Sequence, residues 1–406
     1  MDKLFWIDDD IIKSYQQLIK DTNNINLFKN IIYENKSYVL YVKIVHSLIN
    51  DYPITLLDCD FSNTELTNLG FLTLDLQKSK IIHPKILHSV DELFVTISNL
   101  NNWKITLLTS GTTGVPKKIT HTFSSITKSV KISKSHNADI WGFAYNPTHM
   151  AGIQVFFQAF LNMNTIVNIF NKPLRNMHLL VENYLISHIS ATPTFYRLFV
   201  QKEVTFVSIK QVSCGGEKLE KNLKIRLKKC FPYAKIRNIY ASTEAGSLFA
   251  SKGEYFKIPQ KLSQYIKIID SEILIHKDIL GVSNDIPLQN GWYYSGDIIE
   301  IIEDDPEIIF KFLHRKNEMI NVGGYKVNPN EVEEEIRKIE NVNSVRVYGL
   351  KNSVLGNILC ADIVVNDITE KEIRKILSSK LQPFKSPRFF NFVKKIEITR
   401  TGKIKR

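Results

Sequence analysis

The sequence has 406 residues, of which 44% are hydrophobic and 23% are charged. This ordinary globular composition excludes a disordered chain, a collagen and a small disulfide scaffold, and the length allows two or three domains. The net charge is +12, from 53 Lys and Arg against 41 Asp and Glu. Such an excess indicates either a polyanionic partner or lysines spread over a solvated surface.

The four cysteines lie far apart and show no CxxC or Cys/His spacing typical of zinc. The beginning of the chain lacks the basic and apolar regions of a signal peptide, and no uncharged stretch is apolar enough for a membrane span. We therefore expect a cytoplasmic protein without a membrane span.

The chain up to about residue 265 alternates short apolar runs with helical patterns, which is typical of an α/β sheet enzyme. The segment Tyr38–Leu48 is compatible with a helix or a strand. The helices predicted besides it are Ser62–Leu69, with a capping-box start, and Ala151–Leu161. The predicted strands are Ile54–Leu57, Lys104–Leu108, Ile166–Ile169, Tyr184–Ile189 and Gln211–Ser213.

After residue 265 the pattern changes to short strands separated by turn residues, which predicts an antiparallel β subdomain. Its predicted strands are Ile266–Ile269, Glu272–Ile275, Trp292–Tyr294, Ile298–Ile302 and Ile308–Leu313. The remainder predicts a small α+β domain with helices Glu331–Ile339 and Thr369–Leu377 and strands Val342–Tyr348 and Leu359–Val365. We place the large N-terminal domain at 1–313, a linker at 314–318 and the small domain at 319–406.

The strongest local motif is LLTSGTTGVPKK, which begins at Leu107 and follows a predicted strand. Its glycines let the backbone approach a ligand, its successive N–H groups can bind an anion, and Lys117 adds a positive charge. The spacing does not fit a Walker A loop. Without further context the segment could equally be a turn.

Four other motifs are weak when each is considered alone. They are YASTE from Tyr240, YSGD from Tyr294, HRKNEMINVGGYKV from His314, and the basic tail RTGKIKR. A single carboxylate at a strand end, such as Glu244, is usually solvated, and so is a basic tail.

Together and in this order, the five motifs resemble those of the adenylate-forming superfamily, which includes acyl- and aryl-CoA synthetases, luciferases of the firefly type and adenylation domains of peptide synthetases. The resemblance covers roughly residues 50–406. Ala241 replaces a glycine, Ser295 replaces a threonine and Lys118 replaces a common glycine of the family pattern. The chain is also shorter than usual before the phosphate loop and between Tyr240 and Asp297, which could trim the acyl pocket or an oligomer contact.

The resemblance implies two half-reactions. A carboxylate attacks the α-phosphate of ATP·Mg²⁺ to give acyl-AMP and pyrophosphate, and a thiol of coenzyme A or of a carrier protein's phosphopantetheine then displaces AMP. Two like charges 4 Å apart repel by about 4 kcal/mol at an effective dielectric constant of 20, so the site must offset this repulsion. In the resemblance, Lys403 and Thr243 contact the reacting centre, and Glu244 binds Mg²⁺ through oxygen.

The resemblance also assigns nucleotide contacts. The phosphate contacts are Thr109, Ser110, Gly111, Thr112, Thr113, Gly114 and Lys117, the adenine contacts are Gly215, Gly216, Glu217 and Tyr240, and the ribose contacts are Asp297 and Arg315. Asn317 occupies the hinge about which the small domain rotates, and Gly323 and Gly324 line the thiol tunnel.

His149 matches the residue that lines or gates the carboxylate pocket, although a lone His before an apolar helix can also be a satisfied core residue. No Asp lies between Tyr145 and Phe160 to pair with an ammonium group, which favours a fatty or aromatic acid over an α-amino acid. Three functions stay open: a thioester-forming ligase, an adenylating enzyme with an amine or hydroxyl acceptor, and a non-catalytic nucleotide-binding protein. We find no motif that reads nucleic acid.

Overall fold

The computed structural model describes residues 2–59, 61, 63–71, 80–81, 84–109, 117–200, 204–251, 253–304, 307–322, 325–352, 356–399 and 404. It divides into two compact units, each of which is described by itself. The first unit comprises Met1–Gly253 and Ile275–Tyr293, and the second comprises Glu254–Leu274 and Tyr294–Arg406. The predicted fold class, α/β with an α+β C-terminal part, is confirmed.

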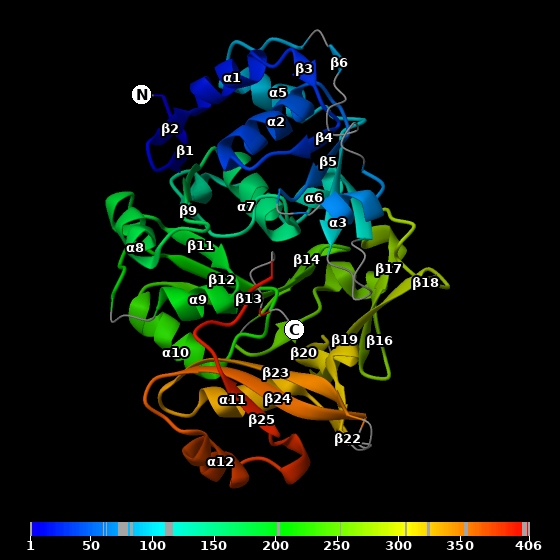
Figure 1. Cartoon of the computed structure of the whole chain (residues 1–406). Helices are drawn as coiled ribbons and strands as arrows, with labels where there is room; N and C mark the ends of the chain where they lie inside the picture. Colours follow the sequence, from blue (N-terminus) through cyan, green and yellow to red (C-terminus); the bar gives the residue numbers. More distant parts are fainter. Residues whose placement is uncertain are drawn as a thin grey trace. The chain divides into compact units, whose positions relative to one another are not determined.

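An eight-stranded sheet forms the centre of the first unit (Figure 1). Its order is β14–β13–β12–β11–β9–β10–β1–β2, and the six strands between the two edges are parallel. The bounds are β1 Leu4–Asp8, β2 Ile11–Ser14, β9 Ile140–Phe143, β10 Thr165–Asn168, β11 His188–Ala191, β12 Gln211–Gly215, β13 Lys235–Ser242 and β14 Gly246–Ala250.

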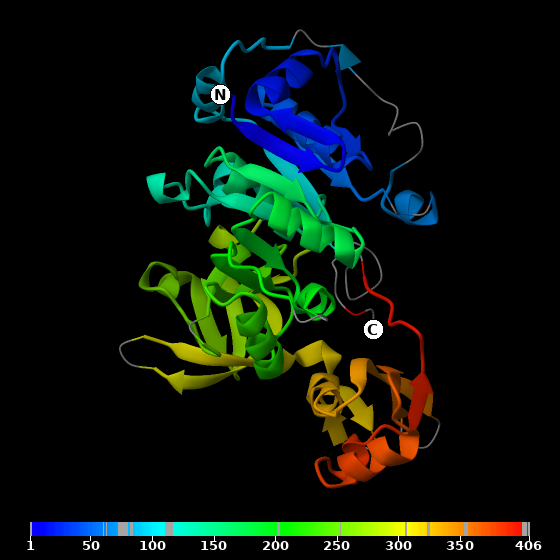
Figure 2. The ribbon, with the colours of Figure 1, turned by 90° about the vertical axis from the view of Figure 1, so that its left-hand side faces the viewer.

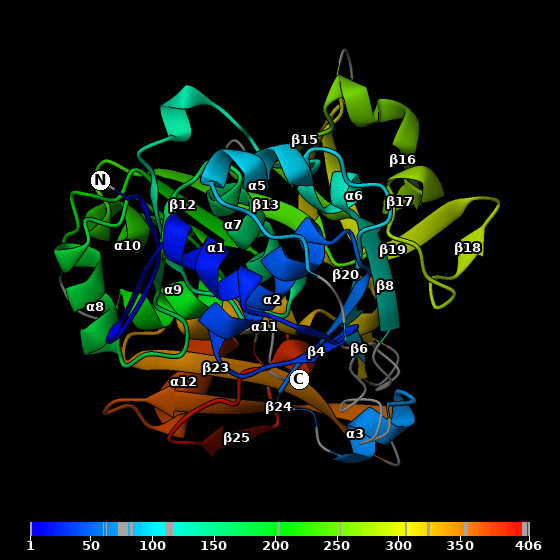
Figure 3. The ribbon, with the colours of Figure 1, turned by 90° about the horizontal axis from the view of Figure 1, so that it is seen from above.

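Helices cover both faces of this sheet, because successive strand residues point to opposite sides. Trp6 and Ile166 pack into one core, whereas their neighbours Ile7 and Val167 pack into the other. The first core is shared with α1 (Tyr15–Asn23), α2 (Ser37–Ile49), α5 (Val90–Ile97) and α7 (Met150–Phe160), and the second with α8 (Leu174–Asn183), α9 (Pro193–Phe199) and α10 (Lys221–Cys230). Seen from above, α1, α2 and α5 lie together (Figure 3).

A four-stranded sheet accompanies the central sheet in the first unit. Its order is β4–β5–β7–β8, with β4, β5 and β7 parallel and β8 antiparallel to β7. The bounds are β4 Ile31–Tyr33, β5 Ile54–Leu57, β7 Lys104–Thr109 and β8 Lys117–Thr122. Two short strands, β3 (Leu27–Phe28) and β6 (Lys80–Ile81), pair with each other, and the short helices are α3 (Asn63–Asn68) and α6 (Phe123–Thr127).

The last part of the chain forms a sheet of order β22–β21–β24–β23, with β25 added beside β24. The elements are β21 Ile320–Val322, β22 Tyr325–Val327, β23 Val342–Asn352, β24 Gly356–Val365, β25 Phe389–Phe392, α11 Pro329–Arg337 and α12 Glu370–Ser378. Both helices pack on one face of this sheet, because their apolar residues share one core with Val345 and Val347 (Figure 2). The capping box predicted at Thr369 and Glu372 is confirmed.

A second sheet has the order β15–β20–β19–β17–β16, with β18 beside β19. Its strands are β15 Phe256–Lys257, β16 Ile266–Ile269, β17 Glu272–His276, β18 Leu288–Gln289, β19 Trp292–Glu303 and β20 Ile309–Arg315. The two strands predicted at Trp292–Tyr294 and Ile298–Ile302 are one strand. Gly296 adopts a φ of +74° inside it, so the backbone passes the predicted turn without leaving the sheet.

Most other predicted elements are confirmed to within a few residues, and Tyr38–Leu48 is helical. The strand predicted at Tyr184–Ile189 is wrong at its start, because Tyr184 caps α8 and Leu185 turns the chain with a φ of +49°. Strands β1 and β2 are not predicted from the sequence. The cap predicted at Ser62 lies outside the described residues, and no helix among those described is long and apolar enough to cross a bilayer.

Candidate active site

The carboxyl ends of the parallel strands lie along one edge of the central sheet. At this edge the connection after β9 and the connection after β11 lead in opposite directions along the strand order. Helix α7 leads from β9 to β10 on one side, whereas α9 leads from β11 to β12 on the other side. Ligands bind at such a switch point, outside the carboxyl ends of the strands. The loops that follow β9 and β11 are therefore the candidate ligand-binding loops.

The loop after β9 carries His149, whose ring is held by an acidic side chain. His149 occupies the position before α7, and its Nε2 lies 2.7 Å from Oδ2 of Asp58. Asn146 donates through Nδ2 to both oxygens of Asp58, at 3.1 and 3.0 Å. Asp58 follows β5 and is buried, whereas the His149 side chain retains 17% exposure. His149 is thus a partnered, oriented and still accessible residue, rather than a fully enclosed core histidine.

The loops after β11 and β12 are joined by Glu217. Its carboxylate accepts hydrogen bonds from the backbone N–H of Thr194 at 3.0 Å and from the Thr194 hydroxyl at 2.8 and 2.9 Å. Arg197 lies 3.6 Å from the same carboxylate and also donates to Thr194. Glu217 therefore fixes the Gly215–Glu217 segment against α9, and Gly216 turns it with a φ of +80°.

The segment at the end of β13 holds the predicted catalytic pair Thr243 and Glu244 in a turn. The Thr243 carbonyl oxygen lies 2.8 Å from Nε2 of His121. The Glu244 carbonyl accepts a hydrogen bond from the N–H of Gly281 at 2.7 Å. These two contacts fix the backbone of the turn, while both side chains stay half-buried. Tyr240, also half-buried, lies earlier in β13 with its ring 5.4 Å from that of Phe249.

Burial changes two pKa values around this turn. It lowers the pKa of His121 below its ordinary value, although the hydrogen bond to the Thr243 carbonyl opposes that shift. It also lowers the pKa of Lys128 to about 8, and the Lys128 ammonium donates to the Ile279 carbonyl at 2.9 Å. A neutral His121 that donates from Nε2 to Thr243 can accept from the Ser125 hydroxyl at Nδ1, 3.1 Å away.

The predicted phosphate loop joins β7 to β8. Thr109 and Lys117 pair across these antiparallel strands, so the two ends of the loop are adjacent. Lys117 is half-buried. Ser110, Gly111, Thr112, Thr113 and Gly114 lie outside the described residues.

Asp297 and Arg315, the predicted ribose contacts, belong to the second unit and meet there. They pair in register across β19 and β20, and Nε of Arg315 donates to Oδ1 of Asp297 at 2.8 Å. The buried carboxylate of Glu272 accepts from the N–H of Gly296 at 2.9 Å and from Lys316 at 3.1 Å. The bond to Gly296 supports the backbone immediately before Asp297.

The predicted hinge residue Asn317 lies in a short 3₁₀ turn, Lys316–Glu318, directly after β20. Gly323 and Gly324, predicted to line the thiol tunnel, and Lys403, predicted to be catalytic, lie outside the described residues. Ile404 is described and pairs with Ile398.

Two residues of this region are missed by sequence reasoning: Asp58 and His121. Each contacts a predicted site residue that is far away in the sequence, and Asp58 is 91 residues from His149. The signal that could have indicated Asp58 is its place directly after a predicted strand, where parallel strands present side chains to one edge.

Glu244 offers a carboxylate oxygen, the type of atom that a magnesium ion prefers as a ligand. Hard cations prefer oxygen, and Glu244 supplies a carboxylate on a turn whose backbone is fixed on both sides.

Comparison with known families shows to which family the chain belongs. The AMP-binding enzyme family matches residues 94–272, and the AMP-binding enzyme C-terminal domain matches residues 331–403. The chain belongs to the family of AMP-binding enzymes.

Relatives of this AMP-binding enzyme include CoA ligases. It is 24% identical to 2-succinylbenzoate–CoA ligase of Staphylococcus epidermidis over 364 residues, which are 82% of this chain and 76% of the relative. It is 24% identical to 4-coumarate:CoA ligase 1 of Petunia hybrida, over 84% of this chain and 71% of the relative. It is 26% identical to 4-hydroxybutyrate–CoA ligase 1 of Metallosphaera sedula, over 74% of this chain and 61% of the relative.

Solved structures share the fold of this AMP-binding enzyme. The o-succinylbenzoate CoA synthetase of Bacillus subtilis, in complex with its acyl-adenylate intermediate, superimposes with a TM-score of 0.73 at 17% identity. The alignment covers 99% of this chain and 94% of that one. ATP-bound MatB of Rhodopseudomonas palustris gives a TM-score of 0.72 at 14% identity, with the same coverage.

Proposed function

We propose that this AMP-binding enzyme is an AMP-forming acid–thiol ligase. It activates a fatty or aromatic carboxylic acid with ATP and Mg²⁺ and transfers the acyl group to the thiol of coenzyme A or of a carrier protein's phosphopantetheine. The observation that carries the proposal is the carboxyl edge of the central sheet. There, His149, Glu217 and the Thr243–Glu244 turn follow three parallel strands of one sheet and are each held by a partner.

In the first half-reaction a carboxylate oxygen of the acid forms a bond to the α-phosphorus of ATP, and the bond from that phosphorus to the bridging oxygen of pyrophosphate breaks. Thr243 contacts the α-phosphate, and Lys117 with the loop N–H groups of 110–115 holds the outgoing phosphates. Glu244 would hold Mg²⁺, which would neutralise part of the phosphate charge. Lys403 stabilises the charge that develops between acid and phosphate.

In the second half-reaction the thiolate sulfur attacks the acyl carbon, and AMP leaves with the electron pair of the broken C–O bond. We place the boundary of the mobile small domain at 314–318, with rotation at Asn317, so that Lys403 serves the first half-reaction and the Gly323–Gly324 loop lines the thiol path. Asp297 and Arg315 hold the ribose hydroxyls throughout. We place the protein in the cytoplasm.

The acid is proposed by class. The names of the relatives contain two aromatic acids, 2-succinylbenzoate and 4-coumarate, and one short hydroxy acid. An α-amino acid would need a carboxylate for its ammonium group. Asp58 is close to the pocket residue His149, but it already accepts two hydrogen bonds from Asn146 and contacts His149. The Asp58 carboxylate is therefore engaged in holding the pocket.

The test is ATP–pyrophosphate exchange driven by a panel of fatty, aryl and amino acids, including the three acids named above. Lys403→Ala is measured beside the wild type, with Lys405→Ala as the matched control. We expect exchange with one acid class, a loss on the order of 10²–10³-fold in Lys403→Ala, and near wild-type exchange in Lys405→Ala. No exchange with any acid, together with retained ATP binding, would contradict the ligase and favour the non-catalytic nucleotide binder.

The acceptor is tested separately, by AMP release. Release that depends on coenzyme A or on a phosphopantetheinylated carrier supports the thiol ligase. Release that depends on an amine or a hydroxyl compound, but not on a thiol, would identify the alternative adenylating enzyme instead.

A further inference from the structure

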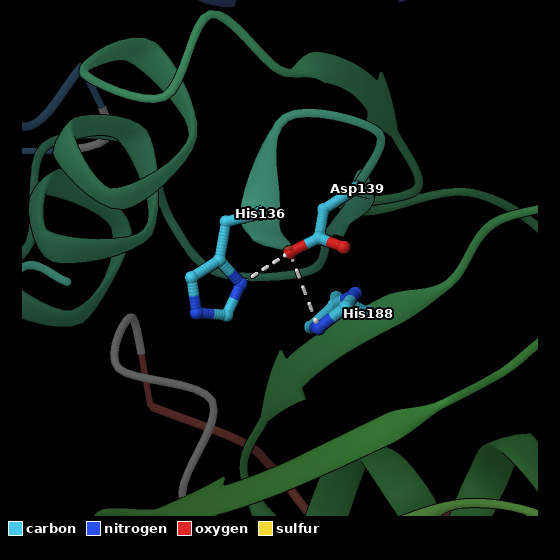
Figure 4. Close-up of side chains that lie close together, drawn as sticks. All are labelled: His136, Asp139 and His188. Atoms are coloured by element: carbon cyan, nitrogen blue, oxygen red, sulfur yellow. Dashed lines mark hydrogen bonds and ion pairs between the residues drawn. The ribbon is translucent and has the colours of Figure 1, made fainter. Parts of the chain in front are cut away.

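The amino ends of β9 and β11 carry three metal-ligating side chains at the edge of the sheet opposite to the candidate active site. Asp139 immediately precedes β9, His188 is the first residue of β11, and His136 ends the short 3₁₀ turn Lys134–His136. One nitrogen of each histidine and one carboxylate oxygen lie within 4.8 Å of one another. Figure 4 shows both rings turned toward the same oxygen of Asp139.

Two of the three distances between the ligand atoms are close to those between ligands of one metal ion, and the third lies within 4.8 Å. Nδ1 of His136 lies 2.7 Å from Oδ2 of Asp139, and Nε2 of His188 lies 3.5 Å from the same oxygen. With metal–ligand bonds of about 2.0–2.2 Å, two ligands of a tetrahedral ion are about 3.3–3.5 Å apart. The Asp139–His188 distance already fits. The His136–Asp139 contact must open by less than about 1 Å, and His136 lies in a short turn with 29% of its side chain exposed.

The His188 ring is oriented by neighbours that leave Nε2 available. Its Nδ1 lies 2.8 Å from the Ser187 hydroxyl, which also accepts the N–H of Ile140 at 2.9 Å and lies 3.2 Å from the Ile140 carbonyl. All three hydrogen bonds of the Ser187 hydroxyl form together when Nδ1 of His188 carries the proton and the hydroxyl donates to the Ile140 carbonyl. An unprotonated Nε2 then faces Asp139 at 3.5 Å, beyond hydrogen-bond distance, which is the arrangement that a cation between them would stabilise.

The surroundings hold the three side chains in place. The His188 ring packs against Trp141 with centroids 4.9 Å apart, and Asn164 donates to the His136 carbonyl at 2.6 Å. Asp139 and His188 retain only 6% and 8% side-chain exposure, whereas the more exposed His136 leaves a side open to solvent. Two buried ligands and one half-buried ligand make a site that an ion can enter from water.

We propose that His136, Asp139 and His188 bind a divalent transition metal ion of the zinc class, with water completing the coordination. Two imidazoles and one carboxylate suit zinc, cobalt or nickel, whereas Mg²⁺ prefers oxygen ligands. The ion would join the turn that contains His136 to the first residue of β11. The site is separate from the Mg²⁺ of the reaction and does not depend on the proposed ligase function.

The test uses the full chain after removal of metals with a chelator. Zn²⁺ is titrated by calorimetry, and Co²⁺ is titrated by its visible ligand-field absorption. We expect one equivalent to bind, the melting temperature to rise, and excess Mg²⁺ to leave the binding unchanged.

Three variants locate the site. His136→Gln and Asp139→Asn are expected to weaken Zn²⁺ binding by more than tenfold, and Ser187→Ala by about 10–100-fold, because Ser187 orients a ligand. The exposed His88→Gln is the matched control and should bind as the wild type does. Melting of each variant without metal verifies that it is folded.

Two results would overturn the proposal. One is the lack of stoichiometric Zn²⁺ or Co²⁺ binding by the wild type. The other is equal binding by wild type and a folded His136→Gln variant, which would mean that the three side chains form only a local hydrogen-bonded cluster.

Discussion

The two ends of β9 and β11 contrast with each other. At their carboxyl ends lie His149, which belongs to a segment with a recognisable sequence pattern, and Thr194, which donates to the predicted residue Glu217. At their amino ends lie Asp139 and His188, which belong to no pattern and meet only because the two strands are neighbours in register. The comparison shows that one pair of parallel strands can carry a site visible in the sequence at one end and a cluster visible only in three dimensions at the other.

The largest expected effect is at the carboxyl edge. Glu244→Gln removes the charge of the proposed Mg²⁺ ligand, so the rate of ATP–pyrophosphate exchange should fall by about 10²-fold or more and require a higher Mg²⁺ concentration. The same change at the exposed Glu182 on α8 should have little effect. Equal Mg²⁺ dependence in wild type and Glu244→Gln would show that Glu244 does not bind the metal ion.

The second prediction concerns pH and the support of the Thr243–Glu244 turn. Because burial lowers the pKa of His121 below 6.5 in the folded state, the unfolded chain takes up this proton first as the pH falls. The contribution of His121 to stability is therefore present above pH 6.5 and is lost as the pH falls below it. His121→Gln should reduce the pH dependence of the unfolding free energy by up to about 1.4 kcal/mol per pH unit.

Urea unfolding at about pH 7 and about pH 5.5 measures this difference. The exposed His88→Gln variant should keep the pH dependence of the wild type. Identical dependence in wild type and His121→Gln would mean that His121 protonates equally in both states.

The third prediction tests the Asp58 contact with the proposed acid pocket. Asp58→Asn removes the charge that orients His149 and accepts from Asn146. The KM for the acid should rise about tenfold, which corresponds to the loss of one good hydrogen bond, while the KM for ATP changes little. An equal rise in both KM values would instead indicate a general loss of structure.

The smallest expected effect is on Zn²⁺ affinity at the amino ends of β9 and β11. The positive charge of the exposed Lys210 acts on His188 and opposes a bound cation. Lys210→Met should therefore raise Zn²⁺ affinity by a factor of about two to five, as expected for one solvent-exposed charge, and leave pyrophosphate exchange unchanged. Weaker Zn²⁺ binding in this variant would contradict the placement of the ion beside His188.

The sequence predicts much of the fold because its strongest signals are local. The apolar pattern of α7 and the capping box of α12 lie within one element each, and the structure confirms both. The prediction is wrong at Tyr184–Leu185, where an apolar pair ends a helix rather than beginning a strand. There, the left-handed backbone of Leu185 and the tertiary packing override local propensity.

The sequence by itself determined the kinship with AMP-binding enzymes, because each family motif is a short contiguous segment of the chain. It also predicted Asp297 and Arg315 as contacts of the same ribose, and the structure brings these two side chains into contact. Only the tertiary structure decided the partners: Asp58 for His149, His121 for Thr243, and His188 for Asp139. The physical reason is that the first two contacts join the four-stranded sheet to the central sheet, and the third joins neighbouring parallel strands. The partners are dozens of residues apart, so their contact leaves no periodic or contiguous trace in the chain.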